Sequence, residues 1–485
     1  MKTYTALPMA RRDSRTPHTT GGWIRVLIIL LLLTEQTGLA TALFASALPQ
    51  LGASFRTPHV VWVLSMTTLV GAIVTPLAGR LADLYGKKRI LVALSVFATL
   101  GSIVSATAGS WDAMLVGRAL SGASMAFLPL AYALIQDIFP ERMKATAISI
   151  SSNGLGLITV IGPLIAGEMI DRLGVMSIFW PMVVLSLVGM ILMMLFVPET
   201  TLRASGRVDW VGAILLGAAL AAVLYALDMG MSWGWASSRT IAYVMGGLAL
   251  VLVWILWERA FPAPLVDVRV LGNRVVLKII LAAAAAMTVI SGIASIYPLM
   301  LMTPSALGVG YGLGTSATDV AFHTLLGGSL LMLGGLYVGV TARRIHPGAH
   351  IATGGLFLVG ASVFFAYMHS QSWHYVVAYG LMGLGGMILA ACPILIVTTV
   401  PADFRAVCAA MLGTTTAVAG TVGTQLTFAI AGTQMVSFSG GLPVYHSSAF
   451  TAAFLVLAVI AVLAVAAGLS LRRLSLMPGE IAAQC

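Results

Sequence analysis

Two ionisable side chains of this chain lie within long apolar stretches, where they could carry out chemistry on protons. Glu35 is near the middle of the apolar run 24–46, and Arg118 lies within the apolar run 112–135. A carboxyl group in such surroundings could bind and release protons, as coupling to a proton gradient requires. Glu35 could instead be a structural carboxylic acid that is hydrogen-bonded to neighbouring helices. A base within an apolar run usually pairs with an acid or lines a cavity, although Arg118 could also reach toward lipid headgroups.

A short charged connector, GRLADLYGKKRI, separates two further apolar runs. Its bases include Lys87 and Lys88, which would anchor a loop at the membrane surface. Asp83 adds nothing to that anchoring, but it can pair with a base and accept from helix N-terminal amides. Gly79 and Gly86 would permit a close approach and a turn.

A second acid, Asp137, closes the run 112–135 on the same side as this connector. It is therefore a candidate member of one charged cluster with Asp83, Lys87 and Lys88. The alternative is that these charges only cap helices and orient loops.

Asp319 and His323 are four residues apart, so they share one face of a helix. They could form a second titrating pair, or they could be rim residues in contact with water. The remaining histidines fall in or near loops and indicate no metal site, and nothing in the sequence implies a cofactor.

The composition indicates a membrane protein with many helices. Of the 485 residues, 59% are hydrophobic and only 9% are charged, whereas a soluble domain has about 25% charged residues. Each apolar run is continuous rather than alternating and can cross a bilayer as a helix. The sequence therefore predicts an all-α polytopic fold. We predict fourteen spans, at 24–46, 60–79, 89–108, 112–135, 145–167, 175–197, 210–227, 240–257, 276–300, 319–341, 349–368, 373–397, 405–432 and 447–471.

The basic residues orient these spans. An even number of spans places both termini on one side, and positive charges favour the cytoplasmic side. If the termini are cytoplasmic, only Arg56, Arg172 and Arg239 of the 26 Lys and Arg residues lie outside, and Arg118 lies within a span. We therefore expect a multi-pass protein of the cell inner (plasma) membrane. The net charge of +10 lies in loops beside the membrane, which argues against a nucleic-acid partner.

The two halves of the chain resemble each other when the sequence is shifted by 261 residues. Pro140 then matches Pro401, Lys144 matches Arg405, and Gly162 matches Gly423. Such parallel halves are typical of transporters that rock about a binding site at the midplane. The expected parts are an N-terminal tail (1–23), a six-helix bundle (24–197), an inserted helix pair with its loops (198–275), a second six-helix bundle (276–471) and a C-terminal tail (472–485).

Several motifs resemble those of the major facilitator superfamily, and specifically of its fourteen-span drug:proton antiporter branch. The connector resembles the superfamily's signature between spans 2 and 3, and a second motif resembles RxxQGxGxA of span 4. Others resemble the antiporter motif GPxxGG and the flanks of the inserted pair. The matching segments are Gly79-x-Leu81-Ala82-Asp83-x-x-Gly86-Lys87-Lys88, Arg118-x-x-Ser121-Gly122-x-Ser124-x-Ala126, Gly162-Pro163-Leu164-Ile165-Ala166-Gly167, Asp209-Trp210-x-Gly212 and Pro264-Leu265-x-Asp267.

The resemblance implies roles for these residues. Asp83 and its basic neighbours would form a clasp between the halves on the cytoplasmic face, and the Gly162-Pro163 motif would hold the halves together. Arg118 would pair with an acid in the first span. The branch has an aspartate seven residues before Ala-Leu-Pro, but this chain has Ala40 there, and Glu35 is the nearest acid.

The resemblance and the residues together predict a proton-coupled exporter of drugs or amphipathic or cationic small molecules, which works as a monomer. Two alternatives remain, an exporter of an endogenous lipid or secondary metabolite and a membrane sensor that transports nothing. The sensor is disfavoured because the chain has no sizeable soluble segment. An enzyme is not expected, because motifs such as HExxH and GxSxG do not occur.

Overall fold

The fold is described from a computed structural model. It describes residues 19–57, 59–200, 208–262, 264, 268, 272–342, 344–399, 402–439 and 442–472. Most of the two predicted tails, Pro401 of the internal repeat, and Leu265 and Asp267 of the motif after span 8 lie outside these residues.

Helices make up nearly all of the described chain. The helices are α1 (Thr20–Phe55), α2 (Trp62–Tyr85), α3 (Lys87–Ala106), α4 (Trp111–Ser121), η1 (Gly122–Ala126), α5 (Phe127–Ile138), α6 (Glu141–Leu173), η2 (Val175–Phe179), α7 (Trp180–Phe196), α8 (Trp210–Trp233), α9 (Ser238–Ala260), α10 (Arg274–Met302), η4 (Ser305–Leu307), α11 (Ala317–Thr341), α12 (Pro347–Tyr367), α13 (Ser372–Gly385), α14 (Met387–Thr399), α15 (Ala402–Gly432) and α16 (Ser447–Arg472). Two antiparallel strands, β1 (Met435–Ser439) and β2 (Leu442–Tyr445), form a hairpin before α16.

Twelve helical segments of the described residues are long and apolar enough to cross a membrane. The polytopic helical class is therefore confirmed. Each predicted span falls on helical segments of the structure, but α6 and α15 are not among the twelve segments. The number fourteen stays a prediction.

The surface of the helices is apolar in the way that a lipid environment requires. On α9, the side chains of Leu248, Leu252 and Leu256 are 54%, 58% and 56% exposed. They recur every fourth residue, so they form one face of the helix. In water such a face would be costly, whereas in a bilayer it contacts acyl chains.

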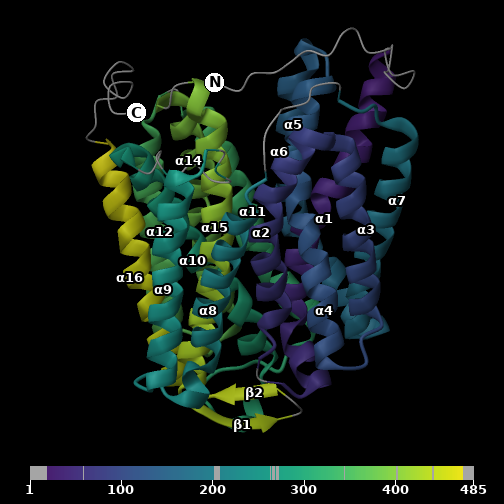
Figure 1. The fold of residues 1–485 in the computed structure, drawn as a ribbon. Helices are drawn as coiled ribbons and strands as arrows, with labels where there is room; N and C mark the ends of the chain where they lie inside the picture. The colour runs from purple at the N-terminus through teal and green to yellow at the C-terminus, as the bar shows by residue number, and fades with distance from the viewer. Residues whose placement is uncertain are drawn as a thin grey trace.

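The helices form two groups, and α8 contacts both of them while α9 packs on α8 (Figure 1). Helices α1 to α7 pack mainly on one another, and so do α10 to α16. The end of α1 packs against β2, and α16 begins just after β2, so α1 begins and α16 ends at the opposite end of the molecule. We call the two ends the hairpin end and the tail end.

Two local features were not predicted. The predicted span 112–135 is interrupted by the 3₁₀ turn η1, which lies against α2. A Cβ on Gly122 would lie 2.9 Å from the carbonyl oxygen of Thr67, so only a glycine lets the two backbones come this close. The other unpredicted feature is the β1–β2 hairpin.

Candidate functional site

Arg118 lies in the interior of the α1–α7 group, where it clamps α4 to α2. Its Nε donates to the carbonyl oxygen of Val63 at 2.8 Å, and Thr67 Oγ1 donates to the carbonyl oxygen of Arg118 at 3.2 Å. The guanidinium lies 4.0 Å from the ring centroid of Phe44 on α1 and 6.0 Å from that of Phe179. Arg118 is only 3% exposed, so it does not reach toward headgroups.

The expected partnership of Arg118 with an acid in the first span is wrong in this structure. Its partners are a backbone carbonyl and aromatic faces, which stabilise a cation through dipole and quadrupole interactions. Glu35 is nine residues before Phe44 on α1, a rise of about 13 Å. The two ionisable groups are therefore separate sites.

Glu35 lies on a part of α1 whose rotation is fixed by its neighbours. Gln36 accepts from Ser186 of α7 at 2.9 Å, and Thr37 donates to the carbonyl oxygen of Ser124 in η1 at 3.2 Å. Both carboxyl oxygens of Glu35 are buried, and neither has a hydrogen-bond partner among the described residues. The expected alternative, a carboxylic acid hydrogen-bonded to neighbouring helices, is therefore not what this structure contains. An orphaned buried carboxyl group is a candidate site for a proton or a cationic ligand.

At the tail end, the charged connector builds a buried ion pair. Lys87 begins α3 and pairs with the carboxylate of Asp137, which closes α5. Thr200 Oγ1 donates to the same carboxylate at 2.8 Å. The side chains of Lys87 and Asp137 are 11% and 13% exposed, so the pair is largely withdrawn from water. The sequence therefore placed Lys87 and Asp137 in one cluster correctly.

The rest of this cluster contains residues that the sequence did not single out. Lys88 Nζ donates to the carbonyl oxygen of Val197 at 2.6 Å. The carboxylate of Glu199 accepts from the backbone N–H groups of Lys88 and Arg89, both at 3.1 Å, and so caps α3. A carboxylate at this position stabilises the helix, because the N-terminus is the positive end of the helix dipole. Its place just after a predicted span was the only signal for Glu199.

The two glycines of the connector differ in role. Gly86 alone separates α2 from α3 and has φ 116°, so a residue with a side chain would be strained there. No heavy atom of the described residues lies within 4 Å of a Cβ built on Gly79. The expectation that Gly79 permits a close approach is therefore wrong for this conformation.

The contacts described for this cluster do not join the two groups. Lys87, Lys88, Asp137 and Glu199 are bonded to residues of α3, α5 and the segment after α7. Asp83 is half-buried near the end of α2, on the same end of the molecule. A clasp between the halves through Asp83 stays a prediction.

At the hairpin end, α6 and α11 join the two groups. The Gly162-Pro163 motif lies inside α6, and a Cβ on Gly167 would lie 2.6 Å from the Cα of Thr318 on α11. One turn later, Asp171 accepts from the backbone N and Oγ1 of Thr318 at 2.9 and 2.7 Å. This part of the motif therefore sits where the halves meet.

A larger residue at Gly167 is expected to separate α6 from α11. In Gly167→Val the added atoms collide with the backbone of Thr318, which cannot rotate away as a side chain can. We expect solute transport to fall by about tenfold or more, because small residues set the helix separation. The measurement is uptake into liposomes that contain the purified variant.

A matched control for this variant is Gly246→Val. Gly246 also lies within a helix, and no described heavy atom is within 4 Å of its Cβ position. The Gly246→Val variant should transport solute at the wild-type rate. Equal losses in Gly167→Val and Gly246→Val would contradict the assignment of a tight helix contact.

The carboxylate of Asp319 and the imidazole of His323 are bonded to other groups rather than to each other. The carboxylate of Asp319 accepts from Ser316 Oγ at 2.9 Å and completes a capping box at the start of α11. His323 contacts the backbone oxygen of Asp319 and Ser372 Oγ, both at 2.7 Å, and is half-buried. Asp319 is exposed and His323 half-buried at the hairpin end, which agrees with the alternative prediction that they are rim residues.

The inserted pair begins at a cap that explains its motif. Asp209 is 1% exposed and accepts from the backbone of Gly212 at 2.8 Å and from Trp257 Nε1 at 3.0 Å. It thus caps α8 and ties it to the end of α9. A Cβ on Gly212 would lie 2.5 Å from this carboxylate, so the glycine leaves room for the cap.

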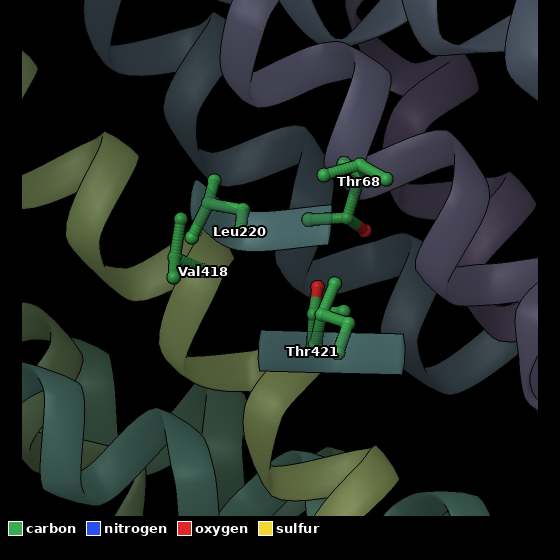
Figure 2. Close-up of a pocket in the computed structure, with 6 residues that line it drawn as sticks. Thr68, Leu220, Val418 and Thr421 are labelled. Carbon is green, nitrogen blue, oxygen red and sulfur yellow. The ribbon is translucent and has the colours of Figure 1, made fainter. Parts of the chain in front are cut away.

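Helix α8 lies along the seam between the two groups. It contacts α2 of the first group and α15 of the second. Figure 2 shows a small pocket at this junction, where Thr68 on α2, Leu220 on α8, and Val418 and Thr421 on α15 come together. No group of three or more His, Cys, Asp or Glu side chains that could hold a metal ion occurs in the described part of the chain.

Comparison with known proteins places this architecture in a family. Residues 30–424 match the Major Facilitator Superfamily. The "Multidrug resistance protein Stp" of Mycobacterium tuberculosis is 27% identical over 401 residues, which are 81% of this chain and 72% of that protein. The "Probable actinorhodin transporter" of Streptomyces coelicolor is 26% identical over 341 residues, 67% of this chain and 57% of that protein.

Solved structures share the fold at low identity. A peptide transporter POT in complex with sulfate has a TM-score of 0.63 at 16% identity and covers 98% of both chains. A bacterial homolog of the human lysosomal transporter Spinster has a TM-score of 0.64 at 16% identity, over 94% of this chain and 98% of that one. The fold and the family are those of transporters rather than enzymes. The chain belongs to the Major Facilitator Superfamily and is a multi-pass membrane protein of that family.

Proposed function

We propose that this protein is a proton-coupled exporter of drugs or other amphipathic or cationic small molecules, which works by alternating access. The observation that carries the proposal is the buried carboxyl group of Glu35, whose oxygens have no hydrogen-bond partner among the described residues. A transporter that exchanges a solute for protons needs one group that either species can occupy. Relatives named for multidrug resistance agree with the choice of solute.

In this proposal the protein lies in the inner membrane of the cell. Its hairpin end faces outward and its tail end faces the cytoplasm. The basic connector then lies on the cytoplasmic side, as the positive-inside rule favours. Fourteen spans would form two parallel six-helix halves, 24–197 and 276–471, with an inserted pair between them. The protein acts as a monomer.

The conformation fits the state of the transport cycle in which the outer face is closed. The two groups are hydrogen-bonded at the hairpin end through Asp171 and Thr318, and they lean apart toward the tail end (Figure 1). In the opposite state, Asp83 and neighbouring bases would clasp the halves at the tail end. Closing one end while opening the other lets Glu35 meet each solution in turn.

A second candidate keeps the fold and changes the solute. One relative carries the name of an actinorhodin transporter, which favours an exporter of an endogenous secondary metabolite or lipid. The same Glu35 site would serve such a solute if its released form is amphipathic.

Cells that lack the gene distinguish the two candidates. Hypersensitivity to cationic drugs together with greater retention of a fluorescent dye is the result expected for a drug exporter. Accumulation of an internal or envelope metabolite without drug sensitivity would favour the second candidate. Neither change, with the protein confirmed in the membrane of the parent cells, would overturn both.

A further inference from the structure

The hairpin end of α2 is the place where all three parts of the protein meet. Arg118 holds the start of α2 to α4 through the carbonyl of Val63. Two residues later, Ser65 Oγ accepts from Gln425 Nε2 of α15 at 2.9 Å, and both side chains are buried. Just before α2, His59 Nδ1 lies 2.9 Å from the carboxylate of Asp228 on α8. This short segment therefore contacts the first group, the second group and the inserted pair.

Backbone hydrogen bonds fix the loop that carries His59. The loop turns at Arg56, which has φ 49° and closes α1. The backbone N–H of His59 donates to Thr57 Oγ1 at 3.2 Å, and that of Trp62 donates to the carbonyl oxygen of His59 at 3.1 Å. The imidazole position is thus coupled to the position of α2.

Few charges surround this pair. Arg56 follows the end of α1 and Arg239 lies in the first turn of α9, and neither arginine forms an ion pair with any described residue. The first two turns of α2 and the hairpin half of α15 carry no charged residue. Asp228 is therefore the acid that acts on His59.

The contact with Asp228 makes the imidazole more basic. The carboxylate of Asp228 raises the pKa of His59 above the ordinary value of 6.5, against a smaller opposing effect of burial. His59 is 32% exposed, so protons from the solution at the hairpin end can reach it, whereas Asp228 is 10% exposed.

The sign of the pH effect follows from this shift. A histidine that is more basic when paired binds its proton more tightly in the paired state. The paired state is therefore favoured as the pH falls. This stabilisation is fully present below the pKa of the unpaired imidazole and is lost as the pH rises through the raised pKa.

The seam beside α8 must change when the hairpin end opens. Helix α8 contacts both α2 and α15. It cannot keep both contacts if those two helices separate. The small pocket lined by Thr68 and Thr421 lies on this seam, toward the tail end from the Ser65–Gln425 bond (Figure 2).

We propose that His59 and Asp228 form a latch, operated by protons from the outer solution, that holds α2 against the inserted pair and keeps the outer face closed. This proposal rests on the transport cycle proposed above and gives α8 a function in it. Outer acidity would then favour closure after a proton has been taken up, which returns the empty transporter to the inward side.

The test measures the width of the hairpin end as a function of pH. Spin labels are placed on the exposed positions Thr107 of the first group and Ser370 of the second. The protein, with its three cysteines replaced by alanine, is studied in lipid nanodiscs. Glu35→Gln is present throughout, so that titration of Glu35 does not contribute.

The latch predicts a specific set of distances. The short-distance population should rise by about fivefold as the pH falls from about 8 to about 5.5. This rise should be lost in His59→Gln and in Asp228→Asn. His59→Arg, which keeps a positive charge at every pH, should hold the short distance even at pH 8, a result that misfolding cannot produce.

An exposed histidine of the same end supplies the control. His446 contacts Ser448 beside the hairpin, and His446→Gln should keep the full pH response. The latch is overturned if His59→Gln responds to pH as the unmodified histidine does. Because the distances are measured without solute or transport, a failure of proton-coupled export would leave this result unaffected.

Discussion

Replacing Glu35 with glutamine is expected to abolish transport driven by a pH gradient while leaving downhill exchange of the solute intact. Glutamine keeps the shape of the side chain but cannot bind a proton, and both carboxyl oxygens of Glu35 are buried. If Glu35 is where solute and proton compete, the accumulation that the gradient drives should fall by about tenfold or more. The measurement is solute uptake into liposomes with and without an imposed pH difference.

The control for this variant is an exposed acid of the same type. Glu168 lies near the end of α6, where its half-exposed side chain pairs with Arg172. Glu168→Gln should accumulate solute as the wild type does. If Glu35→Gln retained its response to the gradient, Glu35 would have no part in proton coupling.

The second large effect is expected at the tail end. In Asp137→Asn the ammonium of Lys87 remains buried but loses its counter-charge, and Thr200 loses an anionic acceptor. Breaking one side of a buried ion pair costs about 3 kcal/mol or more. We therefore expect a large loss of free energy of unfolding, measured by thermal or denaturant unfolding of the purified protein in detergent.

A double variant separates the stranded charge from other causes. Lys87→Met with Asp137→Leu removes both charges and should recover most of the lost stability, because apolar pairs replace buried ion pairs well. Glu141→Gln, which loses only a surface contact with Lys144, should change stability little. If the double variant were as unstable as Asp137→Asn, the stranded ammonium would not be the cause.

Much of the fold could be predicted because the membrane imposes simple rules. Long apolar runs must become helices in lipid, so each predicted span falls on helix in the structure. The cluster of Lys87 and Asp137 could also be predicted, since both lie at helix ends on the same side. These inferences need only hydrophobicity and chain direction.

Contacts that depend on packing could not be predicted in the same way. Arg118 contacts a carbonyl of α2 and the ring of Phe44 instead of an acid. The tight contact of η1 with α2 brings that carbonyl close to Arg118. His59 and Asp228 are 169 residues apart, and nothing in either local sequence indicates the other. Asp319 caps its own helix, and its spacing from His323 alone could not predict this.

The β1–β2 hairpin was missed for a different reason. The segment of Met435–Ser439 and Leu442–Tyr445 alternates around two glycines, a pattern typical of a hairpin. It lies between two long apolar runs, and such a position is equally typical of an irregular loop between two spans. Short strands outside the lipid give a weaker signal than spans do.

Proton movement on addition of solute distinguishes a coupled exporter from an uncoupled one. Purified protein is placed in liposomes that contain a pH-sensitive dye, and a panel of cationic and neutral amphiphiles is added without an imposed gradient. Coupled exchange predicts that a transported amphiphile drives protons in the opposite direction, and that Glu35→Gln eliminates this signal. Transport of the amphiphile by the wild-type protein with no movement of protons would contradict coupled exchange.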